Sequence, residues 1–157
     1  MDIWFGIVTA SDTRGFEQDT AGEALEALIA EQGWKLRERV VVKDERASIS
    51  AAIVKMADEY GVDVVLTCGG TGLSLRDVTP EATQDVCDRN VPGIAEAMRS
   101  YSLTKTGRAM LSRAVVMQRG TTLVINLPGS EKAARENWEA VCDQLEHAVL
   151  MTAGGGH

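Results

Sequence analysis

Gly69, Gly70, Thr71 and Gly72 directly follow an apolar run of the length and pattern of a buried strand. Because glycine carries no side chain, backbone N–H groups in this segment approach an anion closely, and a phosphate fits there. A tight turn that needs positive φ explains the same residues equally well. No Gly-Lys-Ser/Thr follows, and no G-x-G-x-x-G follows the first strand, which excludes the two common nucleotide-binding loops.

A second candidate anion site precedes the last predicted helix. Pro128, Gly129 and Ser130 place helix N–H groups and the positive end of the helix dipole at the same predicted edge of the sheet. In isolation, an ordinary helix cap by Ser130 is the better interpretation. Taken together, the two segments predict an elongated ligand with two phosphate-bearing parts.

Three aspartates, Asp12, Asp44 and Asp77, fall in three different loops at this predicted anion site. Carboxylates and phosphates repel each other at short range, so the arrangement requires a counter-ion. Mg²⁺ resolves the conflict, because it bridges carboxylate and phosphate with few protein ligands and retained waters. The alternative, that each aspartate only caps a turn or a helix, stays open, for Asp12 especially.

Nucleophilic catalysis is poorly supported by the remaining residues. The two histidines, His147 and His157, lie on the polar side of the last helix and at the chain end, where neither suits a general base. Cys68 abuts the glycine segment without a nearby histidine, so a small buried residue that closes a strand is the better interpretation. Five basic residues lie near these loops. They either supply positive charge to the predicted anion site or are ordinary solvated surface charges: Arg14, Lys43, Arg46, Arg76 and Arg113.

The elements that position these loops alternate between strand and helix. Apolar runs predict strands at residues 3–10, 36–42, 62–68, 114–117 and 122–127. The last two are joined by only a few residues, too few for a parallel crossover, so they pair antiparallel. This predicts an α/β fold, a three-layer α/β/α sandwich with a mostly parallel mixed sheet and one antiparallel strand. The chemistry-bearing loops then emerge at the carboxyl ends of strands, where a topological switch opens a crevice.

Capping residues predict where three of the helices begin. Asp19 or Thr20 caps the first helix, Ser48 caps the second, and Thr79 with Pro80 forms the N-cap and first position of the third.

Length, charge and cysteine usage exclude several classes of protein. The 157 residues predict one domain over residues 1–152 with a mobile tail at 153–157. A net charge of -7 argues against nucleic acid and anionic membranes as partners, and no apolar run is long enough for a membrane helix. Three cysteines without a C-x-x-C pair suggest neither a disulfide framework nor a zinc site and favour a reducing, cytoplasmic location.

Four ordered blocks of sequence resemble the molybdopterin adenylyltransferases of the MogA/MoaB type, which include the G domain of gephyrin. The strongest block joins the glycine segment to residues 76–83, RDVTPEAT, and is close to the GGTG…RDVTPEAT pattern of the family. Residues 91–94, 110–113 and 125–130 look like its PG, LSR and NLPG elements, in the expected order. The resemblance spans nearly the whole chain.

This resemblance implies a homotrimer that adenylylates molybdopterin with ATP and Mg²⁺ and releases pyrophosphate. It maps the two catalytic aspartates, which are also the candidate Mg²⁺ ligands, onto Asp44 and Asp77. A molybdenum-insertion protein is a possible further partner. The remaining substrate and nucleotide contacts are predicted at Ser11, Asp12, Gly69, Gly70, Thr71, Gly72, Arg76, Ser112, Arg113, Pro128, Gly129 and Ser130.

The chain departs from the family pattern at two loops. Gly107 stands where relatives often have proline, and the neighbouring lysine, Lys105, is displaced by one position. Lys43 stands where proline is frequent before the aspartate, so the loop that carries Asp44 departs from the family pattern and the loop that carries Asp77 keeps it. A non-catalytic molybdopterin-binding relative with the same fold is the alternative function. A receiver-like signalling module is disfavoured, because it needs an aspartate where Cys68 ends the third strand.

Overall fold

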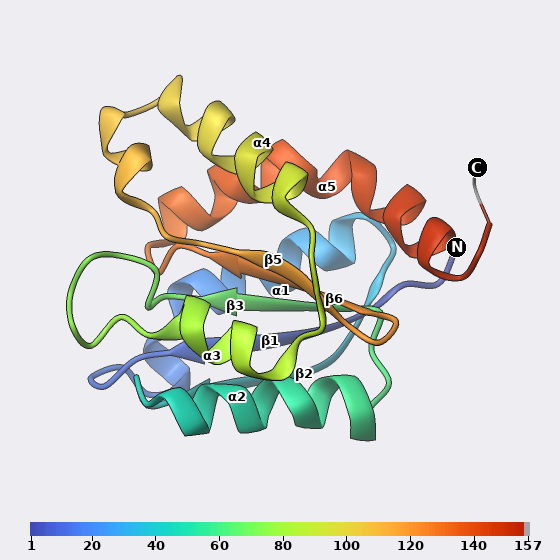
Figure 1. Cartoon of the computed structure of the whole chain (residues 1–157), viewed down its shortest axis with the longest axis horizontal. Helices are drawn as coiled ribbons and strands as arrows, with labels where there is room; N and C mark the ends of the chain where they lie inside the picture. The colour runs from blue at the N-terminus through green and yellow to red at the C-terminus, as the bar shows by residue number, and fades with distance from the viewer. Residues whose placement is uncertain (156–157) are drawn as a thin grey trace.

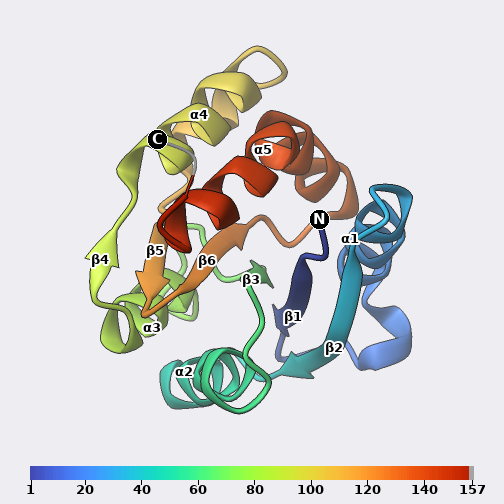
Figure 2. The same ribbon diagram turned by 90° about the vertical axis from the view of Figure 1, so that its right-hand side faces the viewer.

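A six-stranded mixed sheet forms the centre of the molecule, in the order β2-β1-β3-β6-β5-β4 (Figures 1 and 2). The structure, a computed structural model, describes residues 1–155. Its strands are β1 (Trp4–Ala10), β2 (Lys35–Val42), β3 (Val64–Cys68), β4 (Arg89–Asn90), β5 (Val116–Arg119) and β6 (Thr122–Leu127). Its helices are α1 (Thr20–Glu31), α2 (Arg46–Val54), α3 (Thr79–Val86), α4 (Pro92–Leu103) and α5 (Glu131–Thr152), with short turns η1 (Phe16–Gln18), η2 (Lys55–Glu59) and η3 (Gly107–Leu111).

Strand direction agrees with the predicted mixed sheet. β1 pairs in parallel with β2 and β3, and β3 pairs in parallel with β6. β5 pairs antiparallel with both β6 and β4, so among the described strands it alone runs against the others. The sequence analysis missed β4, which is only two exposed residues long.

Helices cover both faces of the sheet and complete the predicted three-layer sandwich (Figure 2). α1, α4 and α5 pack on one face, where Phe5, Trp34 and Trp138 form an aromatic cluster with ring centroids 5.5 to 6.1 Å apart. α2 and α3 pack on the other face, over Val8, Val65 and neighbouring apolar residues. The alternation of side chains along β3 and β6 serves both layers, which explains why these strands are apolar without interruption.

Two helix starts differ from the predicted ones. α2 begins at Arg46 with Glu45 as its N-cap, and the Ser48 hydroxyl instead donates to the Glu45 carboxylate at 3.2 Å. α3 begins at Thr79 with Val78 as its N-cap, one residue earlier than predicted. The predicted cap of α1 is confirmed, because the Asp19 carboxylate accepts from the Gly22 N–H at 2.9 Å.

The end of the chain lies partly outside the described residues. Of the predicted tail at 153–157, residues 156 and 157 are not described. Gly154 and Gly155 donate their N–H groups to the carbonyls of Met151 and Leu150, which closes the last turn of α5. No helix in the described part of the chain has the length and apolar character that a membrane span requires.

The aromatic cluster predicts where the fold is most sensitive to truncation. Trp138 is 2% exposed and packs against Phe5 and Trp34, whereas Trp4 is 39% exposed. Trp138→Ala should lower the free energy of unfolding by about 3–5 kcal/mol, because it leaves a cavity in the core. Urea denaturation measures this loss, with Trp4→Ala as the matched control. Equal losses in the two variants would contradict the assignment of the core.

Candidate active site

Loops from four strands meet at one edge of the sheet. β1 has β2 on one side and β3 on the other, which is the topological switch that the sequence predicted. The Ser11 N–H donates to the Val42 carbonyl at 2.8 Å, and the Gly69 N–H donates to the Leu127 carbonyl at 3.0 Å. The Arg14 guanidinium reaches the Gly129 carbonyl at 3.2 Å. These bonds hold the loops after β1, β2, β3 and β6 together.

The glycine segment is a turn with positive φ angles, and three of its N–H groups have no hydrogen-bond partner within the described chain. Gly69 has φ +90° and Gly70 has φ +71°, so the turn interpretation is correct. A Cβ on Gly69 would lie 2.7 Å from the Ala10 carbonyl oxygen. The N–H groups of Gly70, Thr71 and Gly72 donate no hydrogen bond within the described chain. Three consecutive amides without partners leave donors available to an anion, so the phosphate site stays a prediction beside the turn.

Asp12 and Asp44 are locked to each other across two loops. The Asp12 N–H donates to Asp44 Oδ2 at 3.1 Å, and the Asp44 N–H donates to Asp12 Oδ1 at 3.0 Å. The Arg76 guanidinium binds Asp12 in a forked arrangement, with Nε to Oδ2 at 2.9 Å and Nη2 to Oδ1 at 2.8 Å. Arg76 therefore neutralises Asp12 and leaves Asp44 as the carboxylate without a cation partner.

The two carboxyl groups are shifted in opposite directions. The hydrogen bond from Arg76 holds the pKa of Asp12 below its ordinary value. Desolvation raises the pKa of Asp44, and the nearby charges of Asp12 and Asp77 raise it further. Asp44 Oδ1 is buried and accepts no hydrogen bond from the described residues. Of this pair of carboxylates, Asp44 is thus the one whose charge is less compensated.

Asp77 lies on the other side of the glycine segment. Its Oδ2 accepts from the Ser74 N–H at 3.1 Å, and a Cβ on Gly72 would lie 2.9 Å from the same oxygen. A Cβ on Gly70 would lie 3.4 Å from Asp44 Oδ1 and closer still to the Thr79 hydroxyl. The glycine segment therefore runs between the two carboxylates, with Gly70 next to Asp44 and Gly72 next to Asp77.

The predicted metal ligands suit a cation that keeps most of its hydration shell. The described residues contain no ready-made cluster of three or more histidine, cysteine or acidic ligands. Mg²⁺ typically takes one or two carboxylates and completes its coordination with waters and substrate phosphates. Two buried oxygens without partners, Asp44 Oδ1 and Thr79 Oγ1, face Gly70 beside the free amides. Asp44 Oδ1 therefore suits a site that is completed by a metal-bound phosphate.

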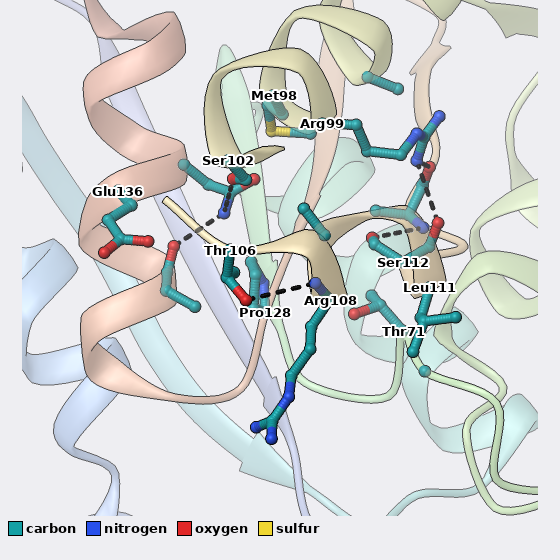
Figure 3. Close-up of a pocket in the computed structure, with 16 residues that line it drawn as sticks. Thr71, Met98, Arg99, Ser102, Thr106, Arg108, Leu111, Ser112, Pro128 and Glu136 are labelled. Atoms are coloured by element: carbon teal, nitrogen blue, oxygen red, sulfur yellow. Dashed lines mark hydrogen bonds between the residues drawn. The ribbon is translucent and has the colours of Figure 1, made fainter. Parts of the chain in front are cut away.

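An apolar cavity of about 250 Å³ adjoins this polar crevice (Figure 3). It lies between α4, η3 and α5, with Ala95, Met98 and Leu111 among its apolar lining residues. Its polar lining comes from the following residues: Thr71, Arg99, Ser102, Thr106, Arg108, Ser112, Glu136 and Asn137. Gly72 and Pro128 also line it, so the cavity opens onto both predicted anion sites.

The other predicted site residues divide into cavity-lining and structural ones. Ser112 lines the cavity, and its Oγ accepts from the Ala114 N–H at 3.2 Å. Ser130 caps α5 by accepting from the Ala133 N–H at 3.2 Å, so its interpretation as a helix cap is correct. Ser11 Oγ accepts from the Thr13 and Arg14 N–H groups and shapes the loop after β1.

Neither Lys105 nor Cys68 lines the cavity or the crevice. The Lys105 ammonium lies 5.3 Å from the centre of the Tyr101 ring. Cys68 is fully buried, and desolvation raises the pKa of its thiol to about 12. Such a thiol is not a nucleophile at neutral pH, as the sequence analysis expected.

Comparison with known proteins decides the family. A family model described as "Probable molybdopterin binding domain" matches residues 6–147. The chain belongs to this family. It is 41% identical over 156 residues to the molybdopterin adenylyltransferase of Helicobacter pylori, covering 97% of this chain and 89% of that protein.

Solved structures agree with this family of molybdopterin-binding domains. The molybdopterin biosynthesis enzyme MoaB of Thermus thermophilus has a TM-score of 0.89 at 46% identity, over 97% of both chains. A structure of molybdenum cofactor biosynthesis protein B has a TM-score of 0.93 at 38% identity, over 98% of both chains. The resemblance seen in the sequence motifs is therefore confirmed.

Two parts of the candidate site were not predicted from the sequence. The side chains that α4 and α5 contribute to the cavity, such as Ser102 and Asn137, belong to no motif. Glu81 lies within a quoted motif, and its only signal was an acidic residue in the first turn of α3. It is bound by Arg113, with Nη1 to Oε2 at 2.6 Å.

The opposite pKa shifts of Asp44 and Asp12 predict opposite effects on the free energy of unfolding. Because the folded chain raises the pKa of Asp44, its ionisation destabilises the fold, with no penalty below pH 3.8 and the full penalty above the folded-state pKa. Asp44→Asn should therefore stabilise the protein near neutral pH, and the gain should vanish toward pH 3.8. Because the pKa of Asp12 is lowered, the stabilisation it gives above pH 3.8 should be lost in Asp12→Asn.

Urea denaturation in buffer with a chelator, near neutral pH and near pH 4, measures both variants. The chelator keeps divalent cations from binding the carboxylates. A loss of stability in Asp44→Asn near neutral pH would contradict the assigned electrostatics.

Proposed function

We propose that this chain catalyses a step of molybdenum cofactor biosynthesis, the Mg²⁺-dependent transfer of the adenylyl group of ATP to molybdopterin. Relatives named molybdopterin adenylyltransferase, at about 41% identity, support the reaction class. The observation that carries the proposal is the row of free N–H groups at Gly70, Thr71 and Gly72, flanked by Asp44 and Asp77. Donors for phosphate oxygens and carboxylates for a metal lie side by side there.

The crevice has groups that suit the triphosphate of ATP. The three free amides donate to phosphate oxygens without any side chain in the way. Mg²⁺ held beside them would supply positive charge that offsets the charge of the phosphates. Asp44, through its unpartnered Oδ1, and Asp77 are the residues that would hold it. Arg76 already pairs with Asp12, so this ion pair limits the acidic charge that the triphosphate meets.

The cavity has the size and lining to bind a pterin ring. Its volume of about 250 Å³ accommodates one fused bicyclic ring, and its walls combine apolar side chains with hydroxyl, amide and carboxylate groups. Thr71, Gly72 and Pro128 form its border with the crevice. A terminal phosphate carried by a ring in the cavity therefore reaches the same free amides.

The reaction needs alignment more than a nucleophile on the protein. An oxygen of the terminal phosphate of molybdopterin forms a bond to the α-phosphorus of ATP, and the bond from that phosphorus to the β-phosphate oxygen breaks, which releases pyrophosphate. Backbone donors and carboxylates that hold the two phosphates in line lower the barrier by orientation and charge stabilisation. This accounts for a site built without histidine or a reactive cysteine.

Several features of the proposal rest on the family resemblance. The homotrimer is one, and four exposed apolar residues beside the site offer surface for contact between copies: Leu73, Leu75, Met110 and Leu111. The cytoplasmic location and a molybdenum-insertion protein as partner stay predictions. The alternative function is a non-catalytic molybdopterin-binding relative with the same fold and trimer, which binds the pterin without turnover.

Adenylyl transfer to molybdopterin is the direct test. Purified protein with molybdopterin, ATP and Mg²⁺ should yield adenylylated pterin and pyrophosphate, detected by mass spectrometry. Asp77→Asn should abolish product while the fold and the oligomeric state persist, because a carboxylate beside the glycine segment is lost. Asp88→Asn is the matched control, since the Asp88 carboxylate accepts from the Gly120 N–H at the far edge of the sheet. Undiminished turnover by Asp77→Asn would refute its role, and pterin binding without turnover by the wild-type protein would favour the alternative.

Filling the cavity should separate pterin binding from nucleotide binding. Ala133 lines the cavity from the first turn of α5, and its neighbour Lys132 is exposed and does not line it. Ala133→Leu should raise the KM for molybdopterin by at least about tenfold while the KM for ATP stays within about twofold, because only the ring site loses volume. Lys132→Leu should change neither constant. A change confined to the KM for ATP would place the nucleotide base in the cavity instead.

A further inference from the structure

Arg113 was predicted to contact substrate, yet every nitrogen of its guanidinium donates a hydrogen bond to the protein. Nε donates to the Gly72 carbonyl at 2.8 Å, and Nη2 donates to the Asp77 carbonyl at 2.6 Å. Nη1 and Nη2 donate to the two Glu81 carboxylate oxygens at 2.6 and 3.3 Å. The backbone N–H of Arg113 donates to the Thr71 carbonyl at 2.8 Å. Nε and Nη2 thus bind the loop between β3 and α3, and Nη1 binds the first turn of α3.

These bonds fix both ends of one short stretch of chain. Gly72 borders the Asp77 carboxylate, and Asp77 ends the turn that Ser74 begins, with its N–H donating to the Ser74 carbonyl at 2.9 Å. Leu73 and Leu75, inside this stretch, are 66% and 98% exposed, so no core contact holds it. The Arg113 guanidinium therefore acts as a brace, by which we mean that it joins the Gly72 and Asp77 carbonyls across a loop with few packing contacts.

Glu81 holds the brace in place. It lies in the first turn of α3, and the hydrogen bond from Arg113 lowers the pKa of its carboxyl group. The guanidinium fork contacts a carboxylate and two carbonyls at once, which a lysine ammonium on a flexible stem does not reproduce.

We propose that Arg113 is a positioning residue: braced by Glu81, it sets the place of Asp77 by clamping the Gly72 and Asp77 carbonyls, and it contacts neither substrate. This inference rests on the proposed function, in which Asp77 acts at the reacting phosphates. Arg113→Lys should then lower kcat by about 10²-fold, because the Asp77 carboxylate is displaced, and leave the KM for molybdopterin within about twofold. Glu81→Gln should give a smaller loss of kcat, since the carbonyl contacts remain.

A double-mutant cycle with Asp77→Glu separates positioning from direct contact. If Arg113 acts through Asp77, the double variant should be no slower than the slower single variant, within about twofold. If Arg113 contacts substrate, the two losses should multiply, and this outcome would overturn the inference. Arg119→Lys is the matched control, because Arg119 also binds a carboxylate and a carbonyl, those of Asp58 and Val86, away from the site. It should leave kcat unchanged.

Amide hydrogen exchange gives a readout that does not depend on turnover. Arg113→Lys should raise exchange at the amides of residues 74 and 77, whose hydrogen bonds the brace maintains, while Arg119→Lys should not. Unchanged exchange in a folded Arg113→Lys protein would overturn the inference even if kcat falls. Failure of the proposed function is seen separately, as the absence of adenylylated pterin with the wild-type protein.

Discussion

Repulsion between carboxylates at one end of the sheet is the constraint that shapes this site. Asp12 and Asp44 face each other from adjacent loops, and each accepts the backbone N–H of the other. Arg76 compensates Asp12, which leaves Asp44 partly desolvated without a cation. Folding alone would not favour this arrangement, because a buried carboxylate oxygen without a partner costs free energy. The arrangement is consistent with a site that reaches its lowest free energy only when a cation and phosphates are bound.

The fold was predictable where burial leaves a pattern in the sequence. β1, β3 and β6 are covered on both faces, so their apolar runs are continuous and their approximate bounds were correct. β4 pairs through only Arg89 and Asn90, which are exposed and carry no such pattern. The start of α2 was misplaced because Ser48 is a common cap residue, whereas the side chain of the actual N-cap, Glu45, accepts no backbone N–H of the helix.

The charged residues of the candidate site could be predicted from the sequence, whereas the cavity beside them could not. Asp12, Asp44 and Asp77 were singled out because acidic residues at a predicted anion site are a contradiction that the sequence itself displays, and the family resemblance selected Asp44 and Asp77 among them. The cavity needs side chains from α4, η3 and α5, which meet only through tertiary packing. Arg113 shows the same limit: a motif marks it as important, but only the structure shows that its guanidinium faces the loop.

The two halves of the site draw on different hydrophobic layers. Ala95 and Met98, in the cavity wall, belong to the layer under α1, α4 and α5, whereas Ala10 and Ala82, near the loops of Asp12 and Asp77, belong to the layer under α2 and α3. The sheet lies between these layers, so the two halves of the site pack against different core side chains. Under the proposed function, substitutions that retune the ring site and substitutions that retune the phosphate site would therefore fall on two separate sets of core residues, which an engineer can vary one set at a time.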